Sequence, residues 1–161
     1  MDRYTFRAKA KGTNDWVYGA YKKWLTRQPC PVGDSVKEKD IRHVIIIDGF
    51  ADWNMPRGLE SVDIDIATLG QCTGCRDSKQ KLIFEGDIVR YTQDYYGDNS
   101  DMNNWDTAVV VWEGEFNYPA FDLKYHSFDS NAFSELLAVG ARIEIVGNIH
   151  DNPELLEEAI K

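Results

Sequence analysis

Residues 69–91, LGQCTGCRDSKQKLIFEGDIVRY, contain more turn and strand signals than any other window of the chain. Glycines bracket a short extended piece, a polar loop follows, and Leu82-Ile83-Phe84 is an apolar run. Glu85-Gly86-Asp87 is typical of a tight corner, because glycine tolerates positive φ and aspartate accepts hydrogen bonds from nearby backbone N–H groups. The stretch therefore predicts a hairpin, followed by a sharp corner that leads into the next strand. We expect the corner to have a structural role rather than a binding role.

The pattern GQxTGxxDxxxKxIxEGDIV in this stretch resembles the signature of the YopX family, small proteins of bacteriophages and prophages of Gram-positive bacteria. Two further segments resemble the opening and closing motifs of that family: residues 4–19, with YTFRAK and WVYG, and residues 143–156, IEIVGNIHDNPELL. The resemblance covers essentially the whole chain. It implies a phage accessory protein with an SH3-like β-barrel over residues 67–150.

The central stretch departs from the family pattern at two places. Cys72 and Cys75 stand where the family usually has Tyr and Leu, and Lys79-Gln80 stands where it usually has Asn-Gly. Keeping the same turn without Asn-Gly would cost about 1–2 kcal/mol, because these residues best tolerate φ above zero. We expect a different or looser turn, centred on Asp77-Ser78.

Length and composition set the broad class. A chain of 161 residues allows one ordinary domain or two small ones, and a hydrophobic content of 43% is sufficient for a packed core. The sequence contains no run of about 18 apolar residues and no signal-peptide core at its start. Three cysteines fit a reducing compartment. We therefore expect a cytoplasmic protein with no membrane partner.

Charge is distributed unevenly along the chain, whose net charge of −9 opposes nucleic-acid binding. Residues 1–47 hold 10 Lys or Arg against 5 Asp or Glu, whereas residues 92–161 hold 3 against 14. The two regions can attract each other within one chain or between subunits, which favours a homo-oligomer.

Three stretches in the first third of the chain have the alternation or β-branched composition of strands. They are residues 4–9, 15–21 and 42–47. Residues 22–40 and 48–61, with their Gly, Pro and charged residues, predict connecting loops. We expect a small N-terminal β unit over residues 1–66.

The remaining residues, 67–161, predict a second and mainly β domain. Its expected strands after the corner are residues 88–92, 107–112, 116–125 and 142–146. Asn131 is expected to cap a short helix that ends at Gly140, and Asn152-Pro153 to start a last helix over 154–160. The fold class is thus mainly β, a β-rich α+β protein, with a C-terminal SH3-like β-barrel, closed or half-open, and a short C-terminal helix.

Cys72-Thr73-Gly74-Cys75 has the CxxC spacing of a redox pair or of half a zinc site. A hairpin follows it instead of a helix, and the other candidate zinc ligands are scattered: Cys30, His43, His126 and His150. We favour small core cysteines and expect neither a metal nor another cofactor.

Aromatic residues gather in the polar loop that follows residue 92. Tyr95, Tyr96 and Trp105 either fold back onto the core or form a contact surface for another protein chain. The acidic residues 94–101 lack the spacing of a calcium loop, so a solvated loop is the favoured reading.

No nucleophile with a neighbouring base and no phosphate-binding loop is recognisable in the sequence. Asp63 and Asp65 are spaced to face one side of a strand, which leaves a metal-dependent hydrolase as a minor alternative. A second alternative is a role with nucleic acid, either through basic N-terminal residues or by acidic mimicry of DNA. Those basic residues are Arg3, Arg7, Lys9, Lys11, Lys22, Lys23 and Arg27. The leading hypothesis is a non-enzymatic phage or prophage accessory protein that binds a host or phage protein and associates with itself.

Overall fold

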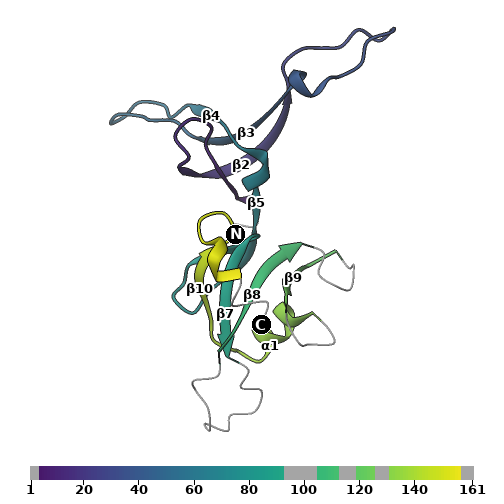
Figure 1. The fold of residues 1–161 in the computed structure, drawn as a ribbon. Coiled ribbons are helices and arrows are strands. Elements are labelled where there is room, and N and C mark those ends of the chain that lie inside the picture. The colour runs from purple at the N-terminus through teal and green to yellow at the C-terminus, as the bar shows by residue number, and fades with distance from the viewer. Residues whose placement is uncertain (1–3, 93–104, 113–118, 126–130, 157–161) are drawn as a thin grey trace. The chain divides into compact units, whose positions relative to one another are not determined.

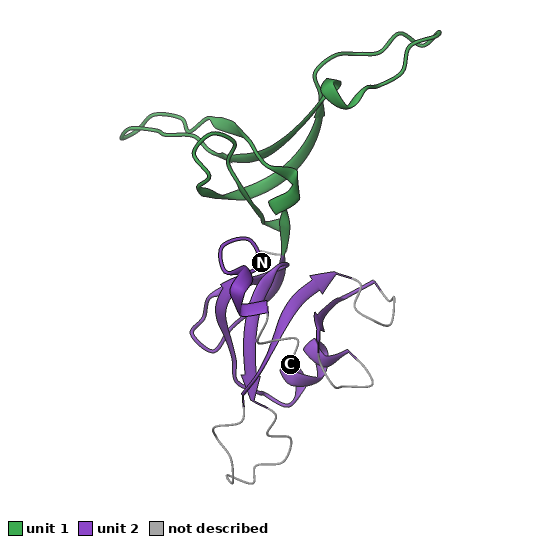
Figure 2. Ribbon diagram, in the orientation of Figure 1, with its two compact units in different colours: residues 1–71 green, residues 72–161 purple. Residues whose placement is uncertain are grey.

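The computed structural model describes residues 4–92, 105–112, 119–125 and 131–156. The chain is mainly β, as predicted, and every strand pair formed by the described residues is antiparallel. It divides into two compact units, residues 1–71 and 72–161 (Figure 2).

The first unit contains the N-terminal strands and two short 3-10 helices (Figure 1). In chain order they are β1 (Phe6–Lys9), β2 (Trp16–Leu25), η2 (Glu38–Asp40), β3 (Ile41–Asp48), β4 (Leu59–Asp63), η3 (Ile66–Thr68) and the start of β5 (Gly70–Arg76). The boundary predicted near residue 66 precedes the division between the units, because Gly70 and Gln71 pair with β1.

Strand β2 is longer than the sequence predicted. Residues 22–25, expected to begin a loop, continue the strand because they pair with Ile41–Val44 of β3. The cluster of buried side chains in this unit is small, with Ala8, Ile45 and Ile64 at its centre. Partly buried side chains pack around it: Phe6, Val17, Tyr21, Ile47 and Leu69.

The second unit is built on a four-stranded sheet in the order β10-β7-β8-β9. Its elements are β6 (Leu82–Phe84), β7 (Asp87–Thr92), β8 (Trp105–Trp112), β9 (Phe121–Lys124), α1 (Ala132–Ala138), β10 (Ile143–Asn148) and η5 (Pro153–Leu155). Strands β10 and β9 form the two edges of this sheet, so the pairings among the described residues make an open sheet rather than a closed barrel.

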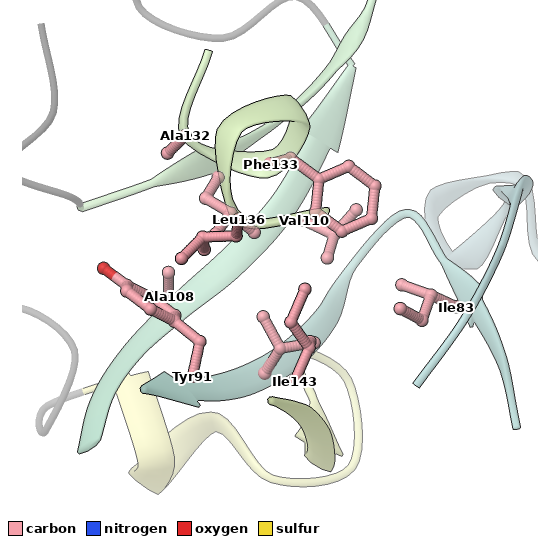
Figure 3. Packing of buried hydrophobic residues seen from close by; sticks show 10 residues of the cluster. Ile83, Tyr91, Ala108, Val110, Ala132, Phe133, Leu136 and Ile143 are labelled. Carbon is pink, nitrogen blue, oxygen red and sulfur yellow. The ribbon is translucent and has the colours of Figure 1, made fainter. Parts of the chain in front are cut away.

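Helix α1 covers the core of the second unit. Phe133 and Leu136 of α1 pack with Tyr91, Val110 and Ile143 of the sheet (Figure 3). The side-chain oxygen of Asn131 accepts a hydrogen bond from the Ser134 N–H, at 2.5 Å, and Gly140 has φ of 68°. The predicted helix and its two caps are therefore confirmed.

The last predicted helix is seen only at its start. Pro153 begins a 3-10 turn that ends at Leu155, and Leu156 follows in helical conformation. Residues 157–160 lie outside the described residues.

Candidate functional site

The central motif first shapes the hairpin between β5 and β6. The Thr73 hydroxyl donates a hydrogen bond to the Ile83 carbonyl, at 3.0 Å, and Gly74 has φ of 82° where the pairing register shifts. Thr73 and Gly74 thus join two strands across an irregular place in the ladder, which is a structural role.

Asp77 organises the hairpin turn. Its buried carboxylate accepts hydrogen bonds from the N–H groups of Lys79 and Lys81, each at 2.8 Å. The turn lies at Ser78-Lys79, and Gln80 adopts φ of 66°. The turn therefore still contains a residue in the left-handed conformation although the chain lacks Asn-Gly. That residue is Gln80, which unlike glycine carries a side chain.

The corner Glu85-Gly86-Asp87 has the backbone that the sequence predicts. Gly86 has φ of 80°, and its N–H donates to the Val110 carbonyl at 2.8 Å. Buried Asp87 accepts a hydrogen bond from the Phe84 N–H, also at 2.8 Å. These contacts hold the strands on both sides of the corner in place.

The closing motif is a second structural turn. The side-chain oxygen of Asn148 accepts from the N–H groups of His150 and Asp151, each at 3.0 Å. A Cβ atom added to Gly147 would lie 2.6 Å from the side-chain oxygen of Asn152. A side chain at this position would therefore force Asn152 and Leu155 to shift.

The cysteines of the CxxC segment both lie in β5. Cys72 is fully buried, and Cys75 packs against the core of the second unit. Cys30 is exposed in the first unit. Within the part of the chain that the structure describes, no three His, Cys, Asp or Glu side chains gather as a metal site requires.

The two carboxylates considered for a hydrolase have separate structural contacts. Asp63 forms a two-point ion pair with Arg42, which lowers the pKa of the Asp63 carboxyl. Asp65 accepts a hydrogen bond from the Ala67 N–H at 3.1 Å and so caps η3. Neither arrangement resembles a pair of carboxylates poised on one substrate.

Only one of the three aromatic residues predicted to make contacts can be placed. Tyr95 and Tyr96 lie outside the described residues. Trp105 starts β8 and is half-buried, with the guanidinium carbons of Arg90 and Arg142 at 4.7 and 5.7 Å from its ring centroid. Trp105 is thus part of a stacked cluster with two arginines.

Several of the most exposed large apolar side chains among the described residues lie in a segment that the sequence suggested was a plain connection. The hairpin between β3 and β4 carries four large side chains, here called the apolar tip. They are Phe50, Trp53, Met55 and Leu59, with 89%, 87%, 64% and 76% of their surface exposed. The signal was present as three large apolar residues between Gly49 and Pro56, but glycine and proline suggested only a loop.

Hydrogen bonds within the hairpin between β3 and β4, the two strands labelled in Figure 1, order part of its backbone. The Gly49 N–H donates to the Gly58 carbonyl at 2.8 Å, and the Met55 N–H donates to the Asp52 carbonyl at 3.1 Å. Arg57 and Asp48 form an ion pair of 3.3 Å across the base of the loop. The loop that carries Phe50, Trp53 and Met55 is thus closed at its base, where Leu59 pairs with Asp48 of β3.

None of the described helices has the length and apolar character needed to cross a membrane. No curated protein and no solved structure matches the chain at a significant level. The pattern of the YopX protein family, in contrast, matches residues 5–157, which include the hairpin, the corner and the closing turn described above. The family signature and these structural motifs coincide, and the chain belongs to the YopX protein family.

Proposed function

We propose that this chain is a non-enzymatic accessory protein of a phage or prophage that binds protein, in the first place a second copy of itself. The observation that carries the proposal is the apolar tip, whose four large side chains are at least 64% exposed on one hairpin. Large exposed apolar groups that lie together mark protein interfaces in soluble proteins.

The residue types in the apolar tip are those that contribute most to association. Trp, Phe and Met are enriched at interface centres, and full burial of a large apolar side chain contributes about 1.5–3 kcal/mol. The hydrogen bonds within the hairpin reduce the entropy lost on binding, because part of the loop backbone is already ordered before a partner binds.

Two features of the first unit support self-association. Its buried cluster centres on only three residues, so the unit gains from further burial. Strand β4 is also an edge of its sheet and therefore offers backbone groups to another strand. A second copy that covers the apolar tip and β4 would supply both kinds of contact.

A role through basic N-terminal residues receives less support from their placement. Arg7 is buried, with its guanidinium carbon 4.9 Å from the Trp16 ring centroid. Arg27 is held by the carboxylates of Asp34 and Asp40. These two arginines are therefore engaged within the chain, whereas Lys11, Lys22 and Lys23 remain exposed.

The experiment replaces Phe50 and Trp53 together by serine and measures molar mass by sedimentation across a concentration series. The wild type is expected to form a dimer or larger oligomer, and the double variant to dissociate at concentrations at least about tenfold higher. Val32→Ser is the control, since Val32 is equally exposed at 84% but lies outside the hairpin.

A wild type that stays monomeric at all concentrations would contradict self-association. Pull-down from host lysate with the same three proteins then tests the wider claim of protein binding. If the wild type and the double variant capture the same amount of a host protein, the apolar tip is not the binding surface.

A further inference from the structure

A group of three cations surrounds one buried carboxylate on the second unit. The Glu144 side chain is 7% exposed, and its oxygens lie 2.7 Å from Arg90 Nη2, 3.2 Å from Lys79 Nζ and 3.7 Å from Arg142 Nη2. We call these residues, together with Trp105, the Glu144 cluster. The Glu144 cluster and the apolar tip share no residues. A negative result for binding at one of them therefore leaves the proposal for the other unaffected.

Strand register and the hairpin turn bring the Glu144 cluster together. Glu144 of β10 is the direct partner of Arg90 of β7, and their neighbours Ile143 and Tyr91 belong to the core. Because side chains alternate along a strand, Arg90 and Glu144 lie on the face away from that core. Ser78 donates its N–H to the Ile143 carbonyl at 2.8 Å, which places the adjacent Lys79 at Glu144.

Trp105 reaches the same face from β8. It pairs with Thr92, two residues after Arg90, and its ring lies beneath the guanidinium groups of Arg90 and Arg142. The stacking holds both guanidinium groups near an apolar surface. Arginine pairs with aromatic rings in this way without losing its in-plane hydrogen-bond donors.

The cations of the cluster outnumber its acid. In the described part of the chain, Glu144 is the carboxylate paired with Lys79, Arg90 and Arg142, whose side chains remain 59%, 44% and 57% exposed. The three cations thus share one negative charge, which leaves the cluster with a net charge of +2 among the described residues, and several N–H donors still face solvent. Residues 72–161 hold 7 Lys or Arg against 17 Asp or Glu, so this is a local basic site in an acidic unit.

We propose that the Glu144 cluster binds carboxylate groups of a short acidic segment of a partner protein. Arginine forks bind carboxylates through paired charge-assisted hydrogen bonds, and the half-buried Trp105 adds apolar surface for the aliphatic part of a Glu or Asp side chain. A long polyanion such as nucleic acid is disfavoured, because the unit around the site has a net charge of −10.

The variant for the test is Arg142→Gln. Arg142 makes the longest of the three contacts to Glu144 and is more exposed than Arg90, so its loss disturbs the buried carboxylate least. Lys124→Gln is the matched control, because Lys124 is an exposed cation of the same sheet that lies over the Tyr125 ring at 5.0 Å. Both changes remove one positive charge, and thermal melting of each variant establishes that it is folded.

The experiment titrates the 15N-labelled full chain with a peptide of six glutamates, with the oligonucleotide dT6 and with inorganic phosphate. The peptide is expected to shift the indole N–H of Trp105 and the amides of residues 79, 90 and 142 in a saturable way that weakens with salt. Affinity should fall about tenfold in Arg142→Gln and stay unchanged in Lys124→Gln.

Three results would overturn the proposal. They are no saturable shift with the peptide, tighter binding of dT6 or of phosphate than of the peptide, and an equal loss of affinity in the two variants. The second result would reassign the site to phosphate groups, and the third would reduce it to a general effect of net charge.

Discussion

The carbonyl of Gly86 accepts a hydrogen bond from the N–H of Ile149 at 3.0 Å, which joins the central motif of the chain directly to its closing motif. Both motifs were conspicuous in the sequence, and a conspicuous motif invites a functional reading. Their contact indicates instead that each shapes the backbone against which the other packs.

Replacing Gly86 by valine should destabilise the protein by more than about 1 kcal/mol, because a β-branched residue is strained at positive φ. An added Cβ would lie 3.5 Å from side-chain atoms of Ile149 and 4.0 Å from His150 Nε2, which are ordinary contacts, so backbone strain is the main cause. Thermal or urea unfolding measures the change. Gly58→Val is the control, since Gly58 has no positive φ and open space around it. Unchanged melting of Gly86→Val with abolished partner binding would make the corner a functional site.

Asp87→Ala should lower the free energy of unfolding by about 1–3 kcal/mol. The change leaves the Phe84 N–H, now bonded at 2.8 Å to the carboxylate, without this acceptor in a buried place. Urea unfolding of the alanine and asparagine variants tests this reason, because asparagine keeps an oxygen at the same position. An equal decrease in the free energy of unfolding in the two variants would show that the hydrogen bond from the Phe84 N–H does not cause the destabilisation.

Gln80→Gly should raise the free energy of unfolding by about 0.5–1 kcal/mol. Gln80 has φ of 66°, a conformation that costs a residue with a side chain about 1–2 kcal/mol, and part of the gain is offset by the greater freedom of glycine in the unfolded chain. Melting temperatures of Gln80→Gly and Gln80→Ala are compared. The alanine variant keeps the strained backbone at residue 80 and should show no gain in stability. A glycine variant that is less stable than the alanine variant would contradict this explanation.

Acid should weaken the loop between β2 and β3 through Asp40. Hydrogen bonds from Arg27 and from the Lys37 N–H hold the pKa of Asp40 at about 2, below the value of about 4 usual for an unfolded chain. A depressed pKa in the folded state means that the stabilisation is present above pH 4 and is lost as the pH falls toward 2.

Unfolding curves of wild type and Asp40→Asn between pH 6 and pH 2 measure this effect. The difference in stability between the two proteins should be largest at pH 6 and shrink as the pH falls. A constant difference over the whole range would show that the charge of Asp40 has no part in it.

Much of the fold could be predicted because its signals are local. Asn131 and Gly140 cap α1 through hydrogen bonds and backbone preferences that act within a few residues. Gly86 marks the corner for the same reason, since positive φ is a property of one residue. The family signature is built of such residues, and the sequence therefore led to the mainly β class and to the YopX family.

The candidate sites depend on contacts between distant residues, and these only the tertiary structure decided. Lys79 and Glu144 are 65 positions apart and meet because the hairpin turn docks on β10. Residues 22–25 of β2 became strand through pairing with β3, which no local preference reveals. Phe50 and Trp53 look like ordinary apolar residues in a loop, and whether a side chain is buried or displayed depends on which other elements cover it. Local sequence determines backbone shape, whereas exposure and charge balance follow from the packing of the whole chain.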